Sequence, residues 1–100
     1  MDQTREMKEQ AESKPTMRAV LEAVISEMVA KGIYWPEAVA EFEKLFILEA
    51  LRRTRGNLGK AALTMGVHRN TLSKKMRELG IEKRRKGEYF ASQPAIKKVV

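Results

Sequence analysis

Apolar residues recur with the period of an α-helix along most of the chain. The first apolar stripe contains Met17, Val20, Leu21, Val24, Ile25, Met28 and Val29. Spacings of three and four residues place these side chains on one face of a helix. We expect this helix to begin near Pro15, because the fixed φ of proline suits a first helical position, and to end at Gly32.

A second helix is predicted over residues 37–54, with Pro36 in its first turn. Between Leu45 and Leu51 this helix is apolar nearly all round, and Glu49 is the one charged residue there. A helix that is apolar on more than one face must be covered on more than one face. We therefore expect the first helix, the C-terminal part of the chain and a second copy of the chain to cover it.

A short third helix is bounded by strong local signals. Gly56 stops the second helix, and Asn57 is a good N-cap for a helix over Leu58 to Met65, which Gly66 ends.

A fourth helix is predicted from His68 or Arg69 to Leu79, capped by Gly80, and the residues beyond it show no strand signals and no sustained periodicity. These elements predict an all-α fold of four helices.

The last two predicted helices have the spacing of a helix-turn-helix. Ala62 is small where two helix backbones must approach closely, and Gly66 can take the positive φ of the turn. Leu72, Met76 and Leu79 face inward on the fourth helix. Its solvent-facing side then carries donors of the kind that read base edges and phosphates in the major groove, namely Arg69, Asn70, Ser73, Lys74 and Arg77. The alternative is an ordinary surface helix with solvated charges.

Charge is divided unevenly along the chain. Residues 1–51 carry ten acidic and six basic side chains, a net charge of −4, whereas residues 52–100 carry fourteen basic and three acidic, a net charge of +11. This division favours protein contacts in the first half and a polyanionic partner in the second. The basic run after the fourth helix is expected to contact phosphate, through Lys83, Arg84 and Arg85.

The residue inventory excludes several kinds of chemistry. The chain has no cysteine and one histidine, which excludes disulfides, thiolate catalysis and a histidine-rich metal site. The glutamates are spread without a partnered nucleophile, so we expect neither an enzyme nor a cofactor, metal or small-molecule substrate. No apolar run approaches the ~20 residues of a membrane span, and the polar N-terminus is unlike a signal peptide, so we expect a cytoplasmic protein with no membrane partner.

Residues 40–81 resemble the Fis-type helix-turn-helix family, which includes the nucleoid protein Fis and the DNA-binding ends of NtrC-like activators. The features that carry the resemblance are Gly56-Asn57, Ala61-Ala62, Met65-Gly66-Val67, Arg69, Thr71-Leu72, Lys75 and Leu79-Gly80. The resemblance is weaker over residues 16–39.

The resemblance implies a homodimer that binds and bends double-stranded DNA as a transcriptional regulator or nucleoid protein. The resemblance, with the polar composition of the N-terminal end and the basic run at the C-terminal end, divides the chain into a flexible arm (1–14), dimerisation helices (15–55), a helix-turn-helix unit (56–81) and a basic tail (82–100). The implied dimer interface comprises Val20, Leu21, Val24, Ile25, Met28, Phe42, Leu45, Phe46 and Leu48. The implied base contacts are His68, Arg69, Asn70 and Ser73, with Arg69 on a guanine edge. The implied backbone contacts are Asn57, Leu58, Gly59, Lys60, Thr71, Lys74, Lys75 and Arg77.

His68 stands where Fis has an asparagine, which leaves two alternatives for it. The imidazole either takes up a proton beside a DNA phosphate, or stays neutral as a helix cap or as an acceptor from a base. Two other functions remain open for the whole chain: a protein-interaction adaptor whose helical core docks another regulator, and an RNA or anionic-membrane binder that uses the basic tail.

Overall fold

The computed structural model describes residues 15–91 and residue 96. The predicted arm over residues 1–14, and all but residue 96 of the segment after residue 91, lie outside the described residues. The chain divides into two compact units, one ending at Ile33 and the other beginning at Tyr34.

The first unit contains helix α2, Met17–Ala30. The expected start at Pro15 is wrong by two residues, because Thr16 is the N-cap and its Oγ1 accepts a hydrogen bond from the backbone N–H of Ala19 at 3.0 Å. A threonine oxygen satisfies a free amide of the first turn, which the proline ring cannot do. The last helical residue is Ala30, Lys31 is the C-cap, and Gly32 follows with φ +72°, the left-handed conformation predicted for it.

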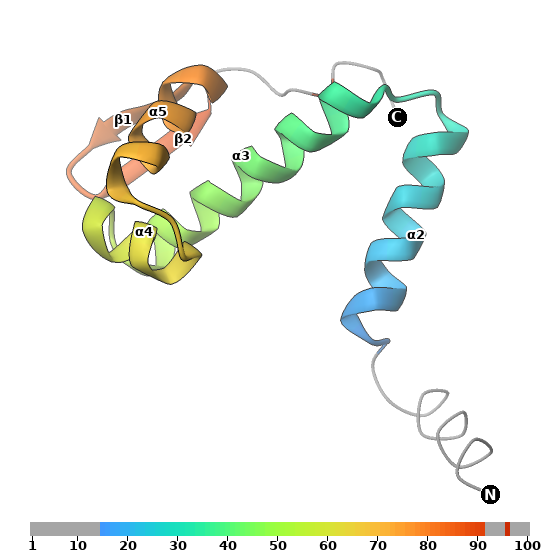
Figure 1. The fold of residues 1–100 in the computed structure, drawn as a ribbon, viewed down its shortest axis with the longest axis horizontal. Coiled ribbons are helices and arrows are strands. Elements are labelled where there is room, and N and C mark those ends of the chain that lie inside the picture. Colours follow the sequence, from blue (N-terminus) through green and yellow to red (C-terminus); the bar gives the residue numbers. More distant parts are fainter. Residues whose placement is uncertain (1–14, 92–95, 97–100) are drawn as a thin grey trace, which may run out of the picture. The chain divides into compact units, whose positions relative to one another are not determined.

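The second unit is built on the long helix α3, Trp35–Arg53, with proline in its first turn as predicted. The Glu37 carboxylate accepts a hydrogen bond from the Tyr34 N–H at 3.2 Å and so satisfies the start of the helix. The helix ends where Arg55 and Gly56 both adopt positive φ, +55° and +80°. Figure 1 shows the other elements of this unit gathered around the C-terminal half of α3.

Helices α4, Leu58–Met65, and α5, Arg69–Leu79, form the predicted helix-turn-helix, and their bounds are confirmed. Gly66 and Gly80 end them in the left-handed conformation, with φ of +74° and +72°. Ala61 and Ala62 are both buried, so α4 packs through its smallest side chains. Burial of Ala62 agrees with the close approach predicted there.

A β-hairpin follows α5, so the expectation that the chain has no strands is wrong. Strand β1, Ile81–Arg85, pairs antiparallel with β2, Glu88–Ala91, with an irregularity in register between Lys83 and Arg85. Ile81 is buried and Tyr89 packs against the core. The hairpin is therefore held by tertiary burial, which the local periodicity of the sequence does not reveal.

One hydrophobic core holds the second unit together. Ile47 and Leu51 of α3 and Leu72 of α5 are its largest fully buried side chains. The tip of the hairpin meets the end of α3 backbone to backbone: a Cβ atom added to Gly56 would lie 2.6 Å from the Cα of Gly87. Glycine is thus required at residue 56 both by its positive φ and by this close approach.

Gly56→Ala should destabilise the protein more than Gly66→Ala does. Both positions have positive φ, which costs an alanine about 1–2 kcal/mol, but no atom lies within 4 Å of a Cβ placed on Gly66. The clash with Gly87 should add about 1–3 kcal/mol to the loss of unfolding free energy. Urea unfolding of both variants measures the difference, and equal losses would show that the hairpin tip yields without cost.

Candidate nucleic-acid interface

Helix α5 presents two contrasting faces. Leu72 and Met76 are buried and Leu79 packs against the core, as predicted. The side chains expected to face solvent are exposed in the case of Arg69, Asn70, Thr71, Lys74 and Arg77, whereas Ser73 is half-buried. One side of α5 thus anchors the helix in the core, and the opposite side is a polar, basic arc.

His68 begins α5 as its N-cap. The imidazole Nδ1 accepts a hydrogen bond from the backbone N–H of Asn70 at 3.0 Å. This bond satisfies one of the free amides of the first turn of α5. His68 is exposed next to Arg69, and the two alternatives for its imidazole in a DNA complex stay predictions.

The N-terminus of α4 offers backbone amides. The Oδ1 atom of Asn57 accepts a hydrogen bond from the Lys60 N–H at 2.9 Å, so this amide and this side chain are already engaged. The N–H groups of Leu58 and Gly59 belong to the same first turn, where no helical partner exists for them. They are the amides of this turn best suited to a phosphate oxygen.

Lys75 lies apart from the polar arc. Its Nζ forms an ion pair with Oε2 of Glu43 on α3 at 2.8 Å. This hydrogen bond to the carboxylate raises the pKa of Lys75 above its ordinary value. Sequence reasoning missed Glu43, because a partner 32 residues away leaves no signal in local spacing.

Two of the three hairpin cations expected at phosphates have partners within the hairpin. The guanidinium of Arg84 lies 5.0 Å from the centre of the Phe90 ring, and Arg85 Nε forms an ion pair with Glu88 at 3.2 Å. Lys83 is exposed and stands opposite Tyr89 in the strand register. The hairpin therefore fixes where these charges lie, which an irregular tail would not.

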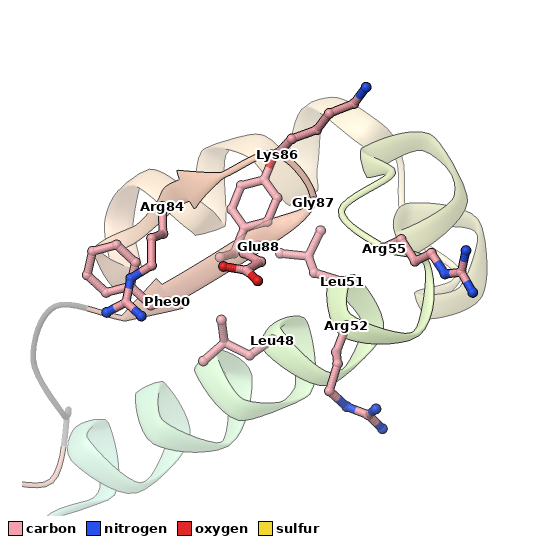
Figure 2. A pocket seen from close by; sticks show the side chains of 10 residues that line it. Leu48, Leu51, Arg52, Arg55, Arg84, Lys86, Gly87, Glu88 and Phe90 are labelled. Atoms are coloured by element: carbon pink, nitrogen blue, oxygen red, sulfur yellow. The ribbon is translucent and has the colours of Figure 1, made fainter.

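An open groove of about 700 Å³ lies between α3 and the hairpin (Figure 2). Leu48 and Leu51 contribute apolar side chains from α3. The charged ends of Arg52, Arg55 and Lys86 point outward from the groove rather than into it (Figure 2). The groove thus has cationic side chains at its rim, and the Glu88 carboxylate lies among the apolar side chains inside it (Figure 2).

The α3 residues expected in the dimer interface lie in two different environments. Phe42, Leu45 and Phe46 are exposed by 57, 56 and 49% of their surface, and the rings of Phe42 and Phe46 lie 5.6 Å apart between centroids. Leu48 is instead half-buried, packs against the core and lines the groove beside the hairpin. The aromatic pair and Leu45 are the large apolar side chains of this set that this unit leaves uncovered.

In the first unit, α2 buries no residue. Its expected interface residues Val20, Leu21, Val24 and Ile25 are each 45–50% exposed, and Met28 is half-buried. The stripe that predicted this helix is therefore an uncovered apolar face.

Within the described part of the chain, no helix is both long and apolar enough to cross a bilayer. No three histidine, cysteine or acidic side chains gather as metal ligands among the same residues.

Residues 38–79, from the first part of α3 to the end of α5, match the family described as "Bacterial regulatory protein, Fis family". Helix α2 and the hairpin lie outside the matched segment.

Curated proteins similar to the chain are DNA-binding transcriptional regulators NtrC. The protein of Rhizobium meliloti (strain 1021) is 54% identical over 50 residues, which are 50% of this chain and 10% of that protein. That of Escherichia coli (strain K12) is 46% identical over 46 residues, 46% of this chain and 10% of that protein. That of Azospirillum brasilense is 44% identical over 55 residues, 55% of this chain and 11% of that protein. The similarity thus spans about a tenth of these relatives, and no solved structure matches the chain.

His68→Ala should lower the free energy of unfolding by about 1 kcal/mol, because α5 loses its N-cap. His68→Asn should keep most of that stability, since asparagine is a preferred N-cap. Urea unfolding of the three proteins at pH 8 measures both effects. An alanine variant as stable as the original protein would show that the bond to Asn70 contributes nothing.

Proposed function

Because residues 38–79 form a helix-turn-helix segment of the Fis family, we propose that the chain binds and bends double-stranded DNA as a homodimer. In this proposal it acts as a bacterial transcriptional regulator or nucleoid-associated protein. The observation that carries the proposal is the polar, basic arc of α5, exposed opposite side chains that anchor the helix in the core.

The arc supports direct reading of bases in the major groove. Arg69 lies in the first turn of α5, where a side chain reaches furthest into the groove in helix-turn-helix complexes. A guanidinium pairs with two acceptors on a guanine edge, which distinguishes guanine from the other bases. Asn70, Ser73 and His68 are further candidates for base contacts, although half-burial shortens the reach of Ser73.

The remaining polar groups support contacts to the DNA backbone. The amides of Leu58 and Gly59 and the exposed side chains of Lys60, Thr71 and Lys74 surround the base-reading arc as donors. Arg77 lies on the same side of α5, about two turns further along. The hairpin cations Lys83, Arg84 and Arg85 extend this set of positive charges beyond the family segment. Lys75 is removed from the set, because Glu43 already holds its ammonium group.

The uncovered apolar faces support a homodimer. The α2 stripe and the α3 side chains Phe42, Leu45 and Phe46 match the two helices that the family uses for its four-helix core. A second copy would remove both faces from water, and the apolar area that each face exposes gives the driving force. The proposal includes bending for a geometric reason. In the family, the two recognition helices of a dimer are closer together than one turn of straight DNA, so the duplex must curve to contact both.

Arg69→Ala should weaken binding to the preferred site by about 1–3 kcal/mol and change binding to random DNA much less. The preferred site is found by selecting bound duplexes from a random pool, and affinities are then measured by fluorescence anisotropy. The matched variant Lys74→Gln should weaken both kinds of binding alike, as a lost phosphate contact does. If Arg69→Ala also weakened both alike, it would be a backbone contact instead.

Phe46→Glu should convert a dimer into a monomer, because each chain would bring one unpaired carboxylate into the interface. Leu63→Glu makes the same change on α4, at a side chain that is 81% exposed, and should leave the dimer intact. Sedimentation at micromolar concentration distinguishes the two variants. A monomeric original protein would contradict the homodimer, and a dimeric Phe46→Glu variant would move the interface elsewhere.

A further inference from the structure

The ion pair between Glu43 and Lys75 joins two separate helices. Its Nζ–Oε2 distance is 2.8 Å, across 32 residues of sequence. The pairs Arg18–Glu22, Arg52–Glu49 and Arg85–Glu88, in contrast, each lie within one helix or across the hairpin turn. The Glu43–Lys75 pair is thus a tertiary contact between α3 and α5.

The pair is partly withdrawn from water. The Lys75 side chain is 38% exposed and that of Glu43 is 32% exposed, so the two charges are less screened than those of a fully exposed pair. The hydrogen bond to Glu43 raises the pKa of Lys75 above its ordinary value, which agrees with a direct contact between the two charged groups.

The position of Lys75 on α5 points away from a role in DNA contact. At about 100° per residue, Lys75 is about 60° around the helix from the buried Leu72 and about 140° from the exposed Asn70. Its side chain leaves the helix at the border of the buried face, on the side of α3. Lys74, one residue earlier, lies only about 40° from Asn70 in the same projection and belongs to the exposed arc.

The buried anchors of α5 occupy a single row along the helix. Leu72 and Met76 are successive residues of one buried row, and apolar contacts are non-directional. An ion pair at the edge of that row adds a directional contact that resists rolling of the helix about its axis. Such rolling would turn the base-reading side chains out of register with the groove.

The pair also stands next to the proposed dimer face. Phe42, Glu43 and Phe46 of α3 line one small, mainly apolar hollow of about 210 Å³. Lys75 of α5 lines the same hollow. The helix that would hold the second copy is therefore tied, at this point, to the helix that would read DNA.

We propose that Glu43 and Lys75 are positioning residues that set the rotation of α5 relative to α3, and thereby the half-site spacing that the dimer prefers. This inference rests on the proposed function of the chain. It replaces the phosphate contact that the sequence indicates for Lys75 with a contact inside the protein.

The test uses three variants. Two are the single substitutions Glu43→Ala and Lys75→Met, and the third is a double variant that carries both Glu43→Lys and Lys75→Glu, so that the two charges are exchanged. Affinity is measured on duplexes that carry the selected site with its two half-sites moved together or apart by one base pair. The original protein should prefer one spacing. Each single variant should lose about 3- to 10-fold of that preference, the scale of coupling between contacting charged groups, and the exchanged pair should restore most of it.

A merely structural effect or a phosphate contact gives different results. Glu82→Gln removes an exposed charge from β1, away from the contact between α3 and α5, and should leave the spacing profile unchanged. If Lys75 contacted phosphate, Lys75→Met would weaken all duplexes equally, as Lys74→Gln does, and reduce the salt slope by about one unit. In that case Glu43→Ala would not weaken binding and the exchanged pair would not recover, which would overturn the proposal.

Failure of the inference is distinguishable from failure of the proposed function. If the original protein selects no sequence and binds no duplex, the proposed function itself is wrong. If it selects a site with a preferred spacing and both single variants keep that profile, only the positioning role is wrong. Thermal unfolding of each variant confirms that the compared proteins are folded at the temperature of the binding measurements.

Discussion

The second unit depends on burying very few large side chains. Ile47, Leu51 and Leu72 are its largest fully buried residues, and each contributes about 1.5–3 kcal/mol to stability when removed from water. Because α3 and α5 meet through so small a core, the neighbouring contacts must fix their relative orientation. Small residues at Ala61 and Ala62 let α4 close against the same core, so the helix-turn-helix and the long helix share one set of contacts.

The hairpin adds side chains to this core and also carries basic residues on β1. Ile81 and Tyr89 add buried area, and the contact between Gly56 and Gly87 fixes the hairpin tip to the turn that precedes α4. The basic residues of β1 therefore stand on a frame attached to the helix-turn-helix. The hairpin lies outside the family segment, and it turns a basic stretch of sequence into a surface of defined geometry.

The sequence predicts what local chemistry determines and misses what distant residues determine. The bounds of α4 and α5 follow from Asn57, Gly66 and Gly80, each of which acts on the chain next to it. The hairpin was not predictable in this way, because its strands are held by burial against α3. The polar arc of α5 follows from helical periodicity, whereas the engagement of Lys75 depends on a residue on another helix.

The uncovered apolar faces of α2 and α3 limit the stability of the chain and also suggest its function. Helix α2 has 14 residues and buries none of them, and an isolated helix of about 12–15 residues is marginal in water because its nucleus is costly. Most helical stability in proteins comes from packing an amphipathic face. For α2 such packing requires a partner surface, which a second copy would supply in the proposed homodimer. In the proposed homodimer, formation of the first helix and association of the two chains are therefore one coupled process, so the dimer would be a condition for the fold of the N-terminal unit.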